Sequence, residues 1–137
     1  MKLCNETITV FNARFDAEND KDIYIPTVII GASWYCEIAS TVDSSGLRAA
    51  DKYTIRIPVN ADFGGKVYVD PINYASADPN SVFTLKNGDI IVKGDASGID
   101  DPRPAVLQTM FSELVTVLGV TDDRRAPNAP HWKVVGK

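Results

Sequence analysis

Histidine and cysteine are scarce in this sequence, which contains one histidine, His131, and two cysteines, Cys4 and Cys36. A zinc site or a redox-active pair needs such side chains at set spacings, for example Cys-x-x-Cys, and neither cysteine lies in one. We therefore expect no metal site. In a reducing compartment both thiols are expected to be free, and a structural disulfide between them is the alternative.

Long apolar runs and a surplus of positive charge are also missing. No run approaches the ~20 apolar residues that a membrane-spanning helix needs, and the opening MKLCNETITV lacks the apolar centre of a secretion signal. The formal net charge is −4, whereas non-specific nucleic-acid binding depends on an excess of Lys and Arg. These absences predict a protein that acts in the cytoplasm in which it is made, with no membrane as partner.

The motifs of catalysis and cofactor binding are absent as well. No Gly-x-Ser-x-Gly turn is present, and Gly64-Gly65 lacks the Lys-Ser/Thr pair of a phosphate-binding loop. The acidic stretch DAENDKD begins like a calcium loop but has Lys21 and Thr27 where that loop needs glycine and glutamate. His131 has no catalytic motif around it and is expected to pack or hydrogen-bond. The sequence predicts a non-enzymatic protein without a cofactor.

β-Strand patterns dominate what is present. The 137 residues, 45% hydrophobic and 23% charged, have the size and composition of one globular domain, residues 1–137. Runs rich in β-branched and aromatic residues recur between short polar segments. The predicted strands are Thr7–Phe11, Ile23–Ile38, Lys52–Val59, Lys66–Val69, Val82–Leu85, Asp89–Lys93, Val115–Val120 and Trp132–Val135.

Two of these strands carry further signals. Ile23–Ile38 contains Pro26, which cannot donate to a ladder and so indicates a sheet edge or a bulge, and Gly31, which indicates a bend. One strand bent in this way can serve two sides of a small barrel. In Lys52–Val59 apolar and polar residues alternate, which is typical of a half-buried strand.

Turns and helices complete the prediction. Asn87-Gly88 between two apolar runs predicts a β-hairpin, because both residues tolerate positive φ. A short helix capped by Asp101 is expected over about 104–113, and a helical turn is expected near 71–77. The predicted fold is therefore mainly β: a small antiparallel β-barrel or sandwich with one short helix on a face or in an opening.

Several stretches, in one order, resemble a known group of sequences. They are ITVFNARFDAENDKDIYIPTVIIGASWY, GLRAADKYTIRIP, YVDP, FTLKNGDIIVKGD and VTDDRRAPNAPHWKVVGK. With these stretches the chain resembles a family of small, largely uncharacterised proteins encoded in tailed phages and prophages of Gram-positive bacteria. The resemblance covers most of the chain, and the last stretch, with its Thr-Asp-x-Arg, Pro-containing bridge and His-Trp-Lys-Val-Val-Gly-Lys, is the most specific.

This resemblance implies a structural role in the virion. Genes of the family sit among capsid and head–tail connection genes, so the expected function is head closure (a stopper) or head–tail joining. A minor capsid or tail-terminator protein is the alternative, and a small-barrel nucleic-acid-binding module is a further one. The implied partners are portal, adaptor or tail proteins and further copies in an oligomeric ring, the isolated chain being expected as a monomer. The implied locations are the host cytoplasm and then the virion, with DNA as passing cargo.

Residues near the end of the sequence are the first interface candidates. Arg124 and Arg125 precede a Pro-stiffened bridge to Pro130, which is expected to hold a last strand that closes the barrel. Both arginines are then expected to meet an acidic neighbour, and a solvated mixed-charge end is the alternative. Trp132 is expected to anchor the core, with an interface anchor as the alternative.

Two polar segments are the other interface candidates. Ser40–Ser45 and Asp95–Asp101 contain too few apolar residues to order strongly by themselves, and loops of this kind often order against a partner. We expect one or both to contact neighbouring subunits. The candidate residues in them are Asp43, Ser44, Asp95, Asp100 and Asp101.

Overall fold

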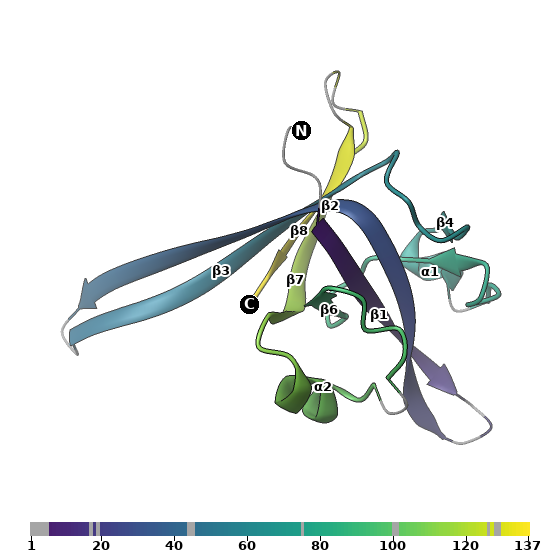
Figure 1. Ribbon diagram of the computed structural model, residues 1–137, viewed down its shortest axis with the longest axis horizontal. Coiled ribbons are helices and arrows are strands. Elements are labelled where there is room, and N and C mark those ends of the chain that lie inside the picture. The colour runs from purple at the N-terminus through teal and green to yellow at the C-terminus, as the bar shows by residue number, and fades with distance from the viewer. Residues whose placement is uncertain are drawn as a thin grey trace.

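The computed structural model describes residues 6–16, 18, 20–43, 46–74, 76–99, 102–125, 127 and 130–137. Cys4, Ser44, Asp100 and Asp101 lie outside the described residues, as do the side chains of Cys36 and Asp43. Eight strands and two short helices follow one another along the described chain (Figure 1). They are β1 (Glu6–Asp16), β2 (Lys21–Asp43), β3 (Gly46–Pro58), β4 (Val67–Tyr68), α1 (Pro71–Tyr74), β5 (Val82–Phe83), β6 (Ile90–Lys93), α2 (Pro104–Met110), β7 (Leu114–Asp123) and β8 (His131–Gly136).

Six of these strands form an antiparallel barrel. Their hydrogen bonds run in the closed order β1-β2-β3-β8-β7-β6, and β6 pairs in turn with β1. Alternation places one face of each strand inside: along β8, Trp132, Val134 and Gly136 are buried and the residues between them are partly exposed. The predicted mainly β fold is confirmed. The barrel is irregular, since β2 and β3 run well beyond it (Figure 1).

β2 belongs to two sides of the barrel. Residues Lys21–Ala32 pair with β1, and residues Ser33–Asp43 pair with β3. The register against β1 shifts between Glu6 and Thr7, next to Gly31, whose φ of 103° is a conformation that glycine adopts readily. The predicted bend is therefore confirmed, and it marks the point at which one strand changes neighbours.

Aromatic side chains make up much of the main core. The centroid of the Trp132 ring lies 4.6 Å from that of Tyr68, 6.1 Å from that of Phe63 and 6.4 Å from that of Phe83. Tilted and edge-on pairs of this kind stabilise a core beyond the burial of their area. Only 4% of the Trp132 surface is exposed, so the prediction that it anchors the core is confirmed.

A second, smaller cluster lies between the sheet and α2. Leu107 is the buried side chain of α2, whereas Met110, one turn further on, is 54% exposed. α2 therefore covers its part of the sheet with one face only. The buried members of the cluster are Phe11, Ile90, Val92, Ala96 and Leu107.

Both predicted helices are present but shorter than expected. α2 begins the predicted span 104–113 and stops early, because the chain is already extended before β7 starts at Leu114. Its N-cap is Arg103 instead of Asp101, with a proline at the first helical position. α1 is a single turn within the predicted 71–77.

The predicted hairpin at Asn87-Gly88 is wrong. Gly88 has a φ of 91° and turns the chain, but β5 pairs in parallel with β4, and β6 lies between β1 and β7. The N–H of Gly88 donates to the carbonyl of Val117 at 2.9 Å. Pairing with strands from distant parts of the chain thus outweighs the local preference of the turn.

The predicted loop over Ser40–Ser45 is also wrong, because strands occupy most of it. β2 continues to Asp43 and β3 begins at Gly46, with an unbroken antiparallel ladder between them. We call residues 37–43 and 46–52 the β2–β3 arm. Figure 1 shows this ribbon reaching far out from the rest of the molecule.

Candidate interaction surfaces

The β2–β3 arm has no third strand within the described chain. β3 pairs with β8 only over Tyr53–Pro58, and β2 pairs with β1 only as far as Ala32. Both outer edges of the arm are therefore open backbone edges, which soluble proteins normally pair, cover or protect with charge. A two-stranded ribbon is marginally stable in water by itself. The arm is therefore a candidate for contact with a neighbouring surface.

Arg124 is engaged within its own chain. Its Nε donates to both carboxylate oxygens of Asp122, at 2.9 and 3.0 Å, and its Nη2 donates to Oδ2 at 2.5 Å. Its guanidinium carbon lies 5.3 Å from the ring centroids of both Tyr68 and Trp132, within the range of a cation–π contact. Asp122 of the same chain therefore already pairs with Arg124, and contact of Arg124 with an acidic neighbour stays a prediction.

This pair fixes the charges of the cluster. Hydrogen bonds from Arg124 lower the pKa of Asp122 to about 2, and the same bonds raise the pKa of Arg124. Burial is the main reason that the pKa of Tyr68 is raised. At neutral pH the cluster therefore contains a guanidinium, a carboxylate and a neutral phenol.

Arg125 lies beside the same pair. Asp122, Arg124 and Arg125 line a hollow of about 490 Å³, and the side chain of Arg125 is exposed. The structure thus brings the predicted Arg124, Arg125 and Trp132 into one region. In this region Trp132 belongs to the core, and Arg124, paired with Asp122, lies over its ring. With one aspartate and two arginines, the hollow has one positive charge in excess.

The loop after β6 is held against β1. The hydroxyl of Thr9 donates to the carbonyl of Gly94 at 2.7 Å and accepts from the N–H of Ala96 at 2.8 Å. The exposed Asp95 accepts from the hydroxyl of Ser97 at 2.7 Å and from its N–H at 3.0 Å, and these bonds lower the pKa of Asp95. The expectation that this segment does not order by itself is wrong for its described part.

A buried polar network fixes the turn that precedes β6. Asp89 is fully buried and accepts from Asn12 Nδ2 at 2.7 Å, from the N–H of Ala13 at 3.0 Å and from Lys86 Nζ. Asn12 also donates to the carbonyl of Thr84 at 2.6 Å and accepts from the N–H of Thr84 at 3.2 Å. The network joins two stretches that carry the sequence resemblance, FNARFD and LKNGD. Its satisfied hydrogen bonds give it a structural role.

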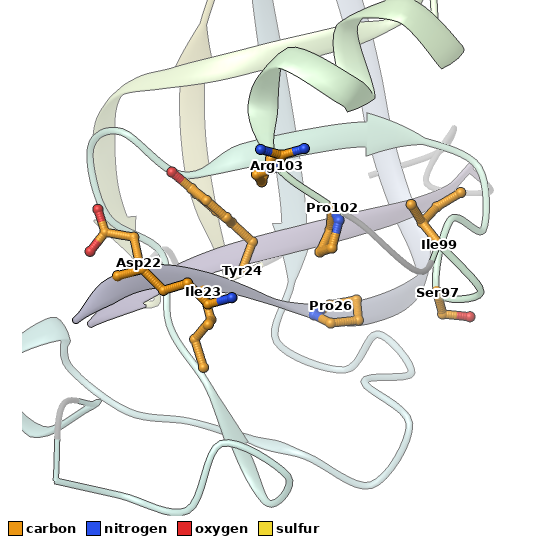
Figure 2. A pocket seen from close by; sticks show the side chains of 9 residues that line it. Asp22, Ile23, Tyr24, Pro26, Ser97, Ile99, Pro102 and Arg103 are labelled. Atoms are coloured by element: carbon orange, nitrogen blue, oxygen red, sulfur yellow. The ribbon is translucent and has the colours of Figure 1, made fainter. Parts of the chain in front are cut away.

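A groove of about 720 Å³ runs between the start of β2 and the segment that leads into α2. Four apolar side chains and one tyrosine line it, and Lys21, Asp22 and Arg103 supply charge. In Figure 2, Asp22 lies at one end of the row of lining side chains, and Ile99 with Ser97 lies at the other. We call it the β2 groove; it is lined by Lys21, Asp22, Ile23, Tyr24, Pro26, Ser97, Ile99, Pro102 and Arg103.

The β2 groove lies along a strand edge. Ile30 exchanges two 2.9 Å backbone hydrogen bonds with Asp62, and the carbonyl of Pro26 accepts from Lys66 Nζ at 2.9 Å. Because backbone groups alternate between the two edges of a strand, the even-numbered residues here face away from β1. The N–H groups of Asp22 and Tyr24 lie on that edge, and no strand of the described chain pairs with them. Pro26 therefore lies at a sheet edge, as predicted.

Sequence reasoning did not find the β2 groove. Tyr24 and Arg103 are far apart along the chain, so no local motif connects them. Pro26 indicated a sheet edge at this place, but it did not indicate which other segment of the chain lies beside that edge. Within the described residues no helix is long and apolar enough to cross a membrane, and no group of three or more His, Cys, Asp or Glu is placed to hold a metal ion.

Comparison with known proteins identifies a family whose function is unknown. No curated protein and no solved structure matches the chain. A family model described as a family of unknown function, DUF6751, matches residues 3–137. Because the match covers nearly the whole sequence, the chain belongs to this family of unknown function.

Proposed function

We propose that this chain is a non-enzymatic assembly protein of a tailed-phage or prophage virion, acting in head closure or head–tail joining. The observation that carries the proposal is the β2–β3 arm, which leaves a closed barrel and has no third strand in the described chain. Open strand edges of this kind are suited to a protein that pairs with neighbours in an assembly. The resemblance to structural-module proteins of tailed phages supplies the context.

Charge supports the same proposal. The net charge of −4 repels the DNA phosphates, so an assembled ring of such chains lets DNA pass without holding it. The partners in this proposal are portal or adaptor proteins on one side and tail proteins on the other. Assembly takes place in the host cytoplasm, and the protein remains in the virion.

Disruption of the gene in the parent phage or induced prophage tests the proposal. The lysate is examined by electron microscopy, and a wild-type copy supplied in trans is the control. Free tails beside heads that are empty or have leaked their DNA are the expected result, because an unclosed head loses its genome. Restoration of joined particles by the wild-type copy ties the defect to this chain.

The other outcomes of this experiment contradict the proposed step. Filled heads beside tails of abnormal length move the assignment to the tail terminator. Full infectious particles in normal number remove the connector proposal altogether. In that case, binding to single-stranded and duplex DNA is the next measurement, because a small barrel that binds nucleic acid is the remaining alternative.

A further inference from the structure

We propose that the β2–β3 arm of one copy docks in the β2 groove of a second copy, where it pairs with the free edge of β2. The inference rests on the proposed function, since it supplies the contact by which copies form a ring. Both surfaces of that contact are present on every copy of the chain. The arm is an open ribbon, and the groove is an open strand edge with an apolar wall beside it.

The two surfaces lie at opposite ends of the same strand. β2 lines the groove at its start and forms the arm at its end, 23 residues in all. The two ends of β2 lie on different sides of the bend at Gly31, so the arm leads away from the groove of its own chain. Figure 1 shows the arm pointing away from the β1–β2 hairpin. Two different patches that fit each other give a head-to-tail contact, which repeats around a ring or along a filament.

The backbone of β2 supplies the first part of the recognition. The N–H groups of Asp22 and Tyr24 face away from β1, and no strand among the described residues pairs with them, so an added strand can accept their hydrogen bonds. This is strand addition to a sheet edge, in which main-chain bonds give affinity and side-chain pockets give specificity. Pro26 has no N–H, so the added ladder ends there and stays short.

Charge supplies the second part. The arm contains three acidic residues, Glu37, Asp43 and Asp51, and two basic ones, Arg48 and Lys52, so it is acidic overall. The groove has the opposite balance, since Lys21 and Arg103 outnumber Asp22. Complementary charge steers two surfaces toward each other.

The groove also offers an apolar wall. Ile23, Pro26, Ile99 and Pro102 line it, and Tyr24 adds an aromatic ring with a polar end. The volume of about 720 Å³ is comparable to that of pockets that enclose a sizeable ligand. A strand laid against the edge of β2 would cover these side chains as well as the backbone. Edge, charge and apolar wall therefore point to one occupant, an extended strand of acidic character.

Cross-linking of purified full-length protein tests the docking. In a background with Cys4→Ser and Cys36→Ser, one sample carries T41C in the arm and a second carries S97C in the groove. A short thiol cross-linker is added to the separate samples and to their mixture over a concentration series. We expect dimers in the mixture at least tenfold above those in either sample alone. An equal mixture of T41C with I72C is the matched control, because Ile72 is 90% exposed and lies outside the groove.

Two results overturn the docking. One is a T41C and S97C mixture that gives no more dimer than the Ile72 control at any concentration up to the solubility limit. The other is a T41C sample that forms dimers alone as readily as the mixture does, because that result means that arms contact each other. A chain carrying both T41C and S97C is expected to give a ladder of oligomers, since the contact is head-to-tail.

A shortened arm gives an independent readout. Residues 39–50 are replaced by Asn-Gly, which joins the two strands by a tight turn. The docking predicts that the intact chain self-associates in sedimentation at high concentration, in contrast to the monomer expected from the sequence. The shortened chain should do so at least tenfold more weakly, while the circular dichroism spectrum of its barrel is retained. Undiminished self-association of this variant contradicts the docking.

The two proposals fail separately. If the cross-link forms as expected but gene disruption leaves normal particles, the docking stands and the head–tail function falls. If gene disruption gives free tails and leaking heads but the cross-link is absent, the function stands and the docking falls.

Discussion

β2 and β3 each contribute one part to the barrel and another part to the arm, and these two parts differ in how many neighbouring strands they have. In the barrel β3 lies between β2 and β8, and its inner side chains Ile55 and Ile57 are fully buried. In the arm each strand pairs, among the described residues, with the other strand alone. The comparison teaches that strand pairing alone does not make a stable part of this molecule; closure and burial do.

Replacing Asp89 with alanine is expected to have the largest effect on the barrel. The change leaves the side chains of Asn12 and Lys86 and the N–H of Ala13 without their acceptor in a buried place. We expect the free energy of unfolding to fall by about 3 kcal/mol. Urea denaturation measures it, and a loss below about 1 kcal/mol means that the network does not hold the barrel together. Asp95→Ala, on the exposed loop, is the matched control and is expected to cost less than about 0.5 kcal/mol.

Replacing Gly136 with alanine tests the closure of the barrel. A Cβ at this position falls 2.9 Å from the carbonyl oxygen of Thr116 and 3.0 Å from a methyl carbon of Val115, so neighbouring strands must move apart. We expect a loss of about 2 kcal/mol in urea denaturation. Gly119→Ala, with nothing within 4 Å of the added carbon, is the control. Equal effects of the two substitutions contradict the idea that β8 packs tightly against β7.

The ion pair between Asp122 and Arg124 is expected to contribute less than about 1 kcal/mol, because both side chains are substantially exposed to water. The pKa of Asp122 falls from 3.8 to about 2 on folding. The stability that the ion pair contributes is therefore present above pH 4 and is lost as the pH falls toward 2. Thermal melts of the unmodified chain and of D122N across this window measure it. The two melting curves are expected to converge as the pH falls, and a constant gap contradicts the assignment.

Shortening the arm is expected to have the smallest effect on the barrel. Replacing residues 39–50 by Asn-Gly removes the outer part of the arm, which pairs with no barrel strand in the described chain. The free energy of unfolding should change by less than about 0.5 kcal/mol. Amide hydrogen exchange of the intact monomer sharpens the comparison, because arm amides are expected to exchange much faster than those of Ile55 and Ile57. A shortened chain that loses several kcal/mol would show that arm and barrel are one cooperative unit.

The parts predicted correctly from the sequence are those in which one local signal decides the structure. Alternation in Lys52–Val59 gives the inward Ile55 and Ile57, Pro26 gives an edge, and Gly31 gives the bend. The strand that contains Trp132 was found for the same reason, since its alternate residues are apolar.

The parts that were missed depend on long-range partners. Asn87-Gly88 is a good hairpin signal, but the burial of Asp89 against Asn12 sends the flanking strands to other neighbours. The arm mixes apolar and polar residues without strict alternation, so nothing in its sequence distinguishes an unsupported strand from a loop. The pairing of Arg124 with Asp122 is local, yet sequence alone does not show that the guanidinium lies over Trp132.

The geometry of the arm also sets an order of events during folding. Its ladder begins at Asp43 and Gly46, so it forms from contacts between residues that are close in the sequence. Closing the barrel requires β1 to find β6 and β3 to find β8, across long stretches of chain, and such pairings are slow. Hairpins form in about 1–10 μs. We therefore expect the ladder of the arm to form transiently before the barrel closes, since it is only marginally stable by itself. Chains in that state expose open strand edges, which can pair with the wrong partner.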